Sequence, residues 1–468
     1  MHVIVIVAYV LVMLLLSIYF AKREVKTNED FLVAGRRLPG VVLAGTLLAT
    51  WVGSGTILGG ASFVYQYGPL AGIIYFAGAP IGIIILYFIA GKVRGLEKNT
   101  LPEILETKFG STTRLVASIF MLLAYAGIAS YQFIGGGNIL SIITNLSEGS
   151  GTLLIAIFVI FLAVTGGMFS VAYTDLISSI LIVFGLLLAL PFILPSVEGF
   201  SGLANELPKH QLTWSGGLTV IQLIGFFLPT LLLLMGDQNM YNRFSSAKSV
   251  STASKSTIGF FFGNALILMS VIIIAASAVI LYPSLENTDM AILQVAADGV
   301  PVPIGSLILA AAVALIITTS NSFLLSSAGN IVYDIYARFK GELSQENYLR
   351  LSRIAVVGLG AFGYFLGTFF PSVLDLQMYA YTMYGAALTP VVLAAFFWER
   401  ATATGALSSI IVGGSATIIW EQALSKPLDW NSVIVSLPLS VFTLIVVSLA
   451  TSNKNKISQQ NNNKSIVK

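Results

Sequence analysis

The sequence predicts an all-α protein that crosses a membrane about 13 times. Of its 468 residues, 56% are hydrophobic and only 10% are charged, against about 25% charged residues in a soluble domain. The mean hydropathy is +0.89. Long apolar runs recur along the chain, and basic residues gather in alternate connections between them. The lipid bilayer is therefore the first partner that the sequence implies, and no nucleic-acid partner is expected.

Thirteen apolar runs are long enough to cross the hydrocarbon core, which takes about 20 residues of helix. The first run lacks a basic leader and a small-residue cleavage site, so it predicts an uncleaved span rather than a signal peptide. A single transmembrane domain is expected over residues 1–451, followed by a polar, disordered tail at 452–468. The runs fall roughly at 3–20, 40–67, 70–91, 115–146, 152–168, 173–195, 218–241, 256–282, 303–337, 351–370, 373–397, 403–420 and 431–451.

The basic residues predict an orientation for these spans. If the N-terminus lies outside, 22 of the 24 Lys and Arg residues fall in inner connections or in the tail, and only Lys209 and Lys426 fall elsewhere. This distribution follows the positive-inside rule, and a wrong span count would scramble it. We therefore expect a multi-pass protein of the cell (inner or plasma) membrane, with the N-terminus outside and the C-terminus in the cytoplasm.

The residue types that most enzymes use are scarce in this chain. It has no cysteine, and His2 and His210 are the only histidines. An intramembrane enzyme would need His, Cys or paired acids that converge at one depth, and the sequence offers no such group. We therefore expect neither an enzyme nor a bound cofactor.

The second apolar run is interrupted at its centre. Within LLATWVGSGTILGGASFVYQY, a serine stands between Gly53 and Gly55, and glycines weaken a helix by adding backbone freedom. Carbonyls freed at membrane depth must find partners inside the protein, so such a break often meets an ion or a solute. Close helix packing through small residues is the alternative explanation.

A second interruption suggests internal symmetry. The second to sixth and the seventh to eleventh helices form two sets of five, at about 40–195 and 218–397, and an odd number makes the sets insert upside down. Each set begins with an interrupted helix, because Gly236-Asp237 breaks the seventh, with Pro229 before it. Interrupted helices at matching positions of inverted repeats predict the central site of a transporter.

The ninth run carries hydroxyl side chains on one helix face. Leu315, Thr318 and Thr319 are spaced at i, i+3 and i+4, so two hydroxyls and a carbonyl could form part of a cation shell. Threonines in membrane helices also bond to their own carbonyls or join neighbouring helices, and that alternative stays open.

Asp175 and Asp237 are acids predicted to lie inside spans, where an ionised carboxylate needs a partner or a water-filled cavity. No Lys or Arg is expected deep in any span, so a cation, a cationic solute group or a proton is left as partner. A wet inner mouth or a protonated acid is the alternative for both. Trp51 beside the first break could line a solute cavity or attract a cationic group, or it could pack against a helix.

Several segments of the chain resemble the sodium:solute symporter family, which includes sodium/glucose, proline, sialic acid and choline transporters. The resemblance runs from about residue 30 to residue 415 with matching segment order. The segments that carry it are DFLVAGRRLPG from Asp30, ATWVGSGTILGG, GGMFSVAYTDLI at 166–177, QNMYNRFSSAKSV at 238–250 and TTSNSFLLSSAGNIVYDIY at 318–336.

The resemblance implies a leucine-transporter-like fold of two inverted five-helix repeats with flanking helices and sodium as the coupling ion. The family's common sodium site uses carbonyls on the first broken helix together with a carbonyl and two hydroxyls on the eighth core helix. In this chain the common site falls on Ala49, Val52, Leu315, Thr318 and Thr319. A second sodium site, present in some members, falls on Asp175, Thr318, Asn321 and Ser322.

The motifs ATWVG and APIG look most like the choline transporter branch. The positions of its aromatic cage fall on Trp51, Ile83, Ile128 and Asp237, of which only Trp51 is aromatic. The sugar-binding pattern is also missing, with Thr56, Tyr75 and Asn264 in its place. The candidate solute site is therefore Trp51, Ser54, Thr56, Gln132 and Asp237, which suits a small zwitterion or an organic cation.

The sequence thus predicts sodium-coupled import of a small organic solute by alternating access. Proton coupling within the same fold is the nearest alternative, with Asp175 and Asp237 as proton carriers. A non-transporting solute sensor is another, although the tail after Ser452 is too short for a kinase or receiver domain. A channel would need a continuous polar stripe, whereas the polar residues gather around two breaks.

Overall fold

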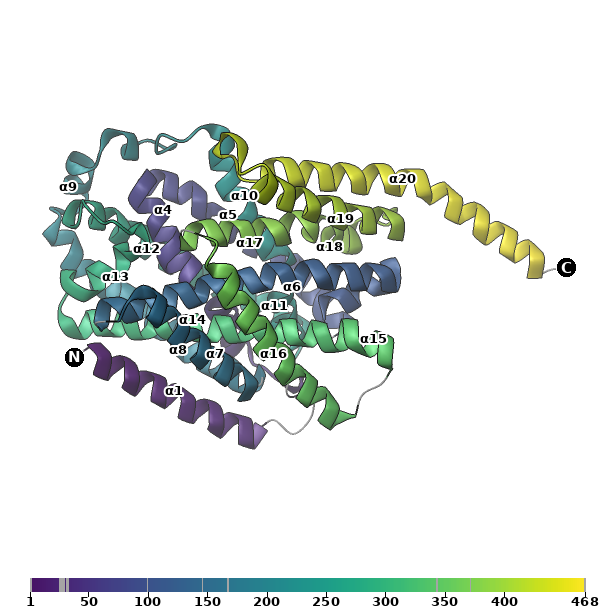
Figure 1. The fold of residues 1–468 in the computed structure, drawn as a ribbon, viewed down its shortest axis with the longest axis horizontal. Helices are drawn as coiled ribbons and strands as arrows, with labels where there is room; N and C mark the ends of the chain where they lie inside the picture. Colours follow the sequence, from purple (N-terminus) through teal and green to yellow (C-terminus); the bar gives the residue numbers. More distant parts are fainter. Residues whose placement is uncertain are drawn as a thin grey trace.

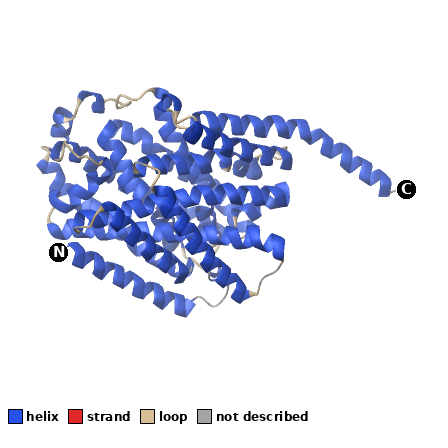
Figure 2. Ribbon diagram, in the orientation of Figure 1, coloured by secondary structure: helices blue, strands red, loops and turns tan. Residues whose placement is uncertain are grey.

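The computed structural model describes residues 2–24, 30, 33–98, 100–144, 146–165, 168–341, 344–370 and 372–466. Within these ranges the chain is helical and contains no β-strand, which confirms the all-α prediction (Figure 2). Residues 166–167 of the predicted 152–168 span and residues 467–468 of the tail lie outside the described ranges.

The main helices follow one another with short connections, and several end in a turn of 3₁₀- or π-helix (Figure 1). They are α1 (His2–Glu24), α3 (Gly40–Trp51), α4 (Gly60–Tyr67), α5 (Pro69–Leu96), α6 (Leu101–Ile143), α7 (Glu148–Thr165), α8 (Met168–Ser196), α9 (Gly199–Glu206), α10 (Val220–Gly236), α11 (Gln238–Ser245), α12 (Val250–Leu281), α13 (Ala291–Gln294), α14 (Val302–Gly329), α15 (Ala337–Lys340), α16 (Gln345–Gly367), α17 (Val373–Ala387), α18 (Thr389–Phe397), α19 (Ala403–Ile418) and α20 (Val433–Ile466).

Among the described residues, 11 helices are long and apolar enough to cross a membrane, and the bent pair Gly40–Trp51 and Gly55–Tyr67 makes a twelfth span. The predicted span at 152–168 corresponds to α7, whose apolar part, Glu148–Val164, is shorter than the others. The count of 13 therefore stays a prediction that depends on whether α7 crosses the bilayer.

Both predicted helix breaks are present. α3 ends at Val52, which is extended (φ −86°, ψ 103°), and the chain resumes as a helix at Gly55 after a bend of 59°. Asp237 is also extended (φ −66°, ψ 119°) and separates α10 from α11. Its side chain accepts a hydrogen bond from the backbone N–H of Asn239 and so caps α11. Glycine next to each break removes side-chain cover exactly where the backbone leaves the helix, which a long apolar run would otherwise resist.

The helices near the first break pack closely on one another. α3 packs along α8 and α12, while α14 packs against α6 and α8. The α3–α8 approach is close at Gly45, because a Cβ there would lie 2.9 Å from the backbone Cα of Leu176. α17 packs against both α6 and α10, and α1 covers α8 and α14 from outside. The breaks are therefore enclosed by α6, α14 and α17.

α20 packs against α19 and then projects beyond the bundle to Ile466 (Figure 1). Residues 452–466 are helical in the structure, whereas the sequence predicts disorder there. A polar helix that projects into water without tertiary packing is marginal. The disordered tail and the division of residues 1–451 into two inverted repeats therefore stay predictions.

Candidate ion and solute sites

The first candidate site joins the broken helix to α14. The hydroxyl of Thr319 donates a hydrogen bond of 3.0 Å to the carbonyl oxygen of Ala49, across 270 positions of sequence. Thr318 donates to the carbonyl oxygen of Leu315 at 3.2 Å. α14 is regular here, so Thr318 and Thr319 are neighbours on its surface, but only the Thr319 hydroxyl contacts the broken helix, whereas that of Thr318 bonds within α14. Four of the five predicted residues are therefore linked in two pairs.

Val52 is the fifth predicted residue of this set, and it is where α3 ends. It is buried, and its own N–H donates to the carbonyl oxygen of Leu48 at 2.8 Å. Because the backbone turns extended at Val52, carbonyls of the last turn of α3 are released from the helical pattern. Carbonyl and hydroxyl oxygens gathered without a carboxylate suit a small monovalent cation.

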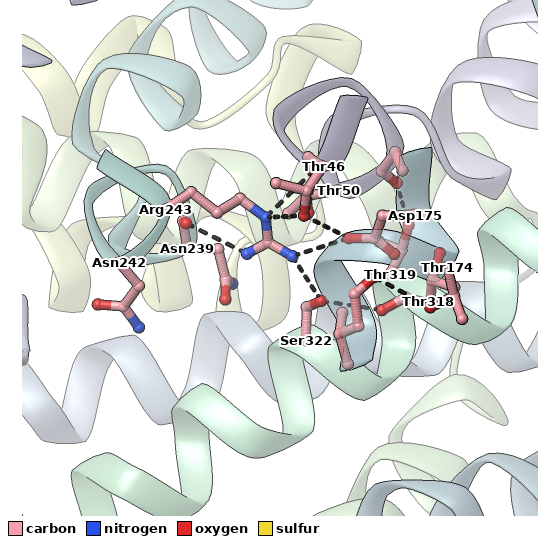
Figure 3. A network of polar contacts seen from close by, with 12 residues as sticks. Thr46, Thr50, Thr174, Asp175, Asn239, Asn242, Arg243, Thr318, Thr319 and Ser322 are labelled. Atoms are coloured by element: carbon pink, nitrogen blue, oxygen red, sulfur yellow. Dashed lines mark hydrogen bonds and ion pairs between the residues drawn. The ribbon is translucent and has the colours of Figure 1, made fainter. Parts of the chain in front are cut away.

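Two residues of the predicted second sodium site, Asp175 and Ser322, contact a buried arginine that the sequence analysis did not predict (Figure 3). Arg243 on α11 places its Nη2 atom 3.3 Å from Oδ2 of Asp175 on α8, and neither side chain is exposed. Nη2 also donates to the hydroxyl of Ser322 at 2.9 Å. The expectation that no Lys or Arg lies deep in a span was therefore wrong, and Asp175 has a basic partner.

Thr46 completes this network from α3. Its hydroxyl donates to Oδ2 of Asp175 at 2.6 Å, and it accepts from Nε of Arg243 at 3.0 Å. Nη1 of Arg243 donates to the carbonyl oxygen of Asn239 one turn earlier. The guanidinium therefore joins α3, α8, α11 and α14, as Figure 3 shows.

The predicted span 218–241 ends two residues before Arg243, so the sequence analysis counted Arg243 among the basic residues of the inner connections. In the structure α11 continues to Ser245, so Arg243 lies within this helix and is buried inside the bundle. The available signal was its distance from the break: α11 begins directly after Asp237, so Arg243 falls in its second turn.

Asn321, the remaining residue of the second set, lies on a different side of α14. Within the described part of the chain, its Oδ1 atom is buried without a hydrogen-bond partner. It lines a cavity of about 60 Å³ together with Thr318, Thr174 and Tyr9. The Oδ1 atom of Asn321 therefore takes no part in the hydrogen bonds of the Arg243 network that holds Asp175 and Ser322.

The solute candidates near the first break contact α6. The N–H and the hydroxyl of Ser54 both donate to Oε1 of Gln132, each at 2.9 Å, and the hydroxyl also reaches the carbonyl oxygen of Tyr131. Thr56, two residues further, is buried in the following π-turn. These contacts bring Ser54 and Gln132 together as predicted from sequence.

α17 supplies residues that sequence reasoning missed. The Trp51 ring lies 5.9 Å from the ring of Tyr381, and the Tyr131 hydroxyl donates to that of Tyr381 at 3.4 Å. A Cβ on Gly55 would lie 2.8 Å from the side chain of Gln377, so this glutamine faces the break directly. No sequence signal singled out these residues, because tyrosines in apolar runs are common at membrane interfaces.

Asp237 lies at the second break and is fully buried. Its Oδ1 atom accepts hydrogen bonds from the Tyr125 hydroxyl and from the N–H of Asn239, whereas Oδ2 has no partner among the described residues. Tyr384 donates to the carbonyl oxygen of Gly236 at 2.8 Å. Tyr384 and Tyr381 are three residues apart on α17, so one helix face contacts both breaks.

An acidic side chain also connects the segments at one end of the bundle. Oδ2 of Asp289, between α12 and α13, accepts a hydrogen bond of 2.8 Å from the N–H of Val373, at the start of α17. The neighbouring Thr288 hydroxyl lies 2.6 Å from that of Ser62 on α4. Burial raises the pKa of Asp289 above its ordinary value. This segment therefore links α4, which follows the first break, to the start of α17, which carries Tyr381.

Comparison with known proteins agrees with this arrangement. A model of the sodium:solute symporter family matches residues 31–413. The chain is 26% identical to a sodium/proline symporter of Haemophilus influenzae, covering 95% of this chain and 94% of that protein. It is 27% identical to a sodium/pantothenate symporter of Escherichia coli, covering 94% of each.

Solved structures show the same fold at lower identity. A substrate-bound, outward-open sodium-coupled sialic acid symporter matches with a TM-score of 0.78 at 22% identity, over 96% of this chain and 98% of that one. A nucleobase–cation symporter in a closed conformation matches with a TM-score of 0.58 at 12% identity, over 92% and 96%. The arrangement of helices around broken segments is thus shared with transporters.

Proposed function

Since the chain belongs to the sodium:solute symporter family, we propose a site for its coupling ion and a chemical class for its solute. The protein is a multi-pass membrane transporter, and it couples sodium to the movement of a small organic solute.

We propose that sodium binds between α3 and α14, at the carbonyls of Ala49, Val52 and Leu315 and the hydroxyls of Thr318 and Thr319. The contact between Thr319 and Ala49 carries this proposal, because it joins a helix break to a hydroxyl face. In that contact a hydroxyl donates to a carbonyl, and both oxygens keep lone pairs that a cation can use. Sodium would replace the weak hydrogen bond with direct coordination.

A second sodium at Asp175, Asn321 and Ser322 has a competitor. Arg243 already neutralises Asp175 and donates to Ser322. A second cation would have to displace this guanidinium or bind near Asn321 alone. We therefore propose that the set at Ala49 and Thr319 is filled first.

For the solute we propose a small zwitterion that lies between the first break, α6 and α17. The half-helix that starts at Gly55 has its N-terminus at the break, and the positive partial charge of such an end favours a carboxylate. The N–H groups of Thr56 and Ile57 donate to the carbonyl oxygen of Gly53, so a carboxylate would compete with that carbonyl for them. Because Oε1 of Gln132 accepts from Ser54, its amide nitrogen is left as a donor for the same carboxylate. Trp51 and Tyr381 would cover the apolar part of the solute.

Asp237 would face the amine of that solute. Its Oδ2 atom is buried and unpartnered among the described residues, which is costly for a carboxylate unless a positive group lies nearby. Arg243 is close enough for its charge to act on Asp237, but its ion pair is with Asp175, so it gives this oxygen no direct contact. The relatives named for proline and pantothenate differ in this respect: proline carries an amine beside its carboxylate, whereas pantothenate carries no ionised amine.

Uptake into proteoliposomes tests this proposal. Labelled L-proline, pantothenate and sialic acid are supplied in turn, with an inward sodium gradient or an equal potassium gradient. We expect sodium-dependent uptake of the zwitterion, inhibited by unlabelled zwitterionic amino acids and not by their N-acetyl derivatives. Uptake of pantothenate or sialic acid with no uptake of L-proline and no inhibition by zwitterions would contradict the solute class while leaving sodium coupling intact.

A further inference from the structure

A groove on the lipid-facing side of the bundle has no role in the transport site. It consists of two adjoining hollows of about 550 and 220 Å³ that share Val41, Ala44 and Gly259. One end lies between the starts of α3 and α12, and the other extends along α8. We call the two hollows together the α3–α12 groove.

The groove exists because small residues meet where α3 and α12 approach. A Cβ on Gly259 would lie 3.0 Å from the Cβ of Ala44, and no other atom is within 4 Å of it. Two backbone hydrogen bonds hold the segments before α3 and α12 side by side. The N–H of Leu38 donates to the carbonyl oxygen of Ser246 at 3.0 Å, and the N–H of Lys248 donates to the carbonyl oxygen of Leu38 at 3.1 Å. The open floor is therefore a fixed feature of the fold.

One end of the groove is basic and rich in hydroxyls. Lys248 and Lys255 line it and are exposed, and no ion pair involves either lysine within the described ranges. Ser251 and Thr252 lie between them, in the first turn of α12. The N-terminus of this long helix adds a positive partial charge at the same place. An anion with several acceptor oxygens complements this end.

The other end is apolar. Leu48 on α3 and Leu176, Ile180 and Phe184 on α8 line it, and the last two are 47% and 58% exposed. From Gly40 to Leu48 the groove follows α3 for about 12 Å, at about 1.5 Å per residue. In a membrane this surface faces hydrocarbon, so an acyl chain is the complementary occupant.

We propose that the α3–α12 groove binds one anionic phospholipid, with its phosphate at Lys248 and Lys255 and an acyl chain along Ile180 and Phe184. Basic pockets between transmembrane helices on the cytoplasmic side bind lipid headgroups in this way. The basic end is cytoplasmic in the orientation proposed from the charge distribution, so the lipid belongs to the inner leaflet. Leu48 precedes the proposed sodium ligand Ala49, and the lipid therefore steadies the half-helix that carries it.

The test measures lipid binding by the purified protein in detergent. Native mass spectrometry counts bound lipid after addition of phosphatidylglycerol or of phosphatidylcholine with the same acyl chains, and thermal unfolding is followed in parallel. We expect phosphatidylglycerol to bind at least tenfold more tightly and to raise the Tm. Inorganic phosphate at millimolar concentration should give no shift, because it lacks the chain.

Matched variants locate the site. Lys248→Gln with Lys255→Gln should reduce phosphatidylglycerol binding to the level of phosphatidylcholine. Lys209→Gln with Lys340→Gln, which removes the same charge from two exposed lysines elsewhere, should leave it unchanged. Gly259→Leu, which fills the junction of the two hollows, should reduce binding of both lipids.

Two results with the unmodified protein would overturn the proposal. One is equal binding of the two lipids by the unmodified protein, a result that needs no variant to be folded. The other is stabilisation by inorganic phosphate equal to that by phosphatidylglycerol, which would indicate an ordinary phosphate site. Retained phosphatidylglycerol preference in the Lys248 and Lys255 double variant would likewise place the lipid elsewhere.

Discussion

Asp237, at the second break, and Arg243, in the helix that follows it, are both buried but have different partners. Arg243 is paired with Asp175, while Asp237 is held by Tyr125 and by the start of α11. The Arg243–Asp175 pair stabilises the fold, because the residues that contact Arg243 lie on four packed helices, α3, α8, α11 and α14. One oxygen of each carboxylate, Oδ1 of Asp175 and Oδ2 of Asp237, has no hydrogen-bond partner among the described residues. The difference is that Asp175 forms an ion pair with Arg243, whereas Asp237 forms none within the described ranges, so a cationic ligand at Asp237 is the proposal to test.

Asp237→Asn should weaken solute binding much more than sodium binding. We expect the solute concentration for half-maximal uptake to rise about tenfold, which corresponds to about 1.4 kcal/mol. Asparagine keeps an oxygen for the Asn239 N–H and is a good helix cap, so the protein should fold. Uptake kinetics at saturating sodium provide the measurement. Unchanged kinetics, or an anionic solute, would make Asp237 a structural cap only.

Arg243→Gln should destabilise the protein strongly, because it leaves the Asp175 carboxylate buried without its charge partner. Removing one member of a buried pair costs about 3–5 kcal/mol. The double variant Arg243→Gln with Asp175→Asn should recover part of this loss, since no lone charge remains. Thermal unfolding in detergent compares the two variants. Equal destabilisation by the single and double variants would show that the ion pair is not what stabilises this region.

At the scale of helices, the glycine-flanked breaks were predictable from sequence, because glycine is costly in a helix and rare without a reason. The hydroxyl face of α14 was predictable from its spacing alone. The burial of Arg243 was not predictable, because the predicted span ended at residue 241 and left Arg243 in an inner connection. Tyr381 and Gln377 were missed because a sequence does not reveal which face of α17 meets another helix.

The α3–α8 crossing offers a matched pair of glycine substitutions. Gly45→Ala should destabilise by about 1–3 kcal/mol, because its Cβ would lie 2.9 Å from the Leu176 backbone and the helices must separate. Gly358→Ala, on α16 with open space around its Cβ, should be neutral or stabilising by up to about 1 kcal/mol. Thermal unfolding of both variants is the check. The same effect at both positions would contradict the close approach.

For the whole molecule, orientation in the membrane is the main open prediction. The N-terminus is expected outside and the tail inside, because 21 of the 24 basic residues still fall in inner connections or in the tail after the buried Arg243 is removed from the predicted 22. Because the chain has no cysteine, Ser201→Cys and Ser458→Cys can be labelled without background. An impermeant thiol reagent on intact cells should label position 201 only. Labelling of position 458 alone would reverse the orientation.

The sodium dependence of solute uptake by Thr319 variants tests the central claim most directly. Thr319→Ala removes the hydroxyl that reaches Ala49, whereas Thr319→Ser keeps it, and Thr257→Ala removes a buried hydroxyl that bonds only within its own helix. The sodium concentration for half-maximal uptake should rise about tenfold in Thr319→Ala, a loss of about 1.4 kcal/mol. It should stay close to the unmodified value in the other two variants. Unmodified sodium dependence in Thr319→Ala, and in its double variant with Thr318→Ala, would show that sodium binds elsewhere.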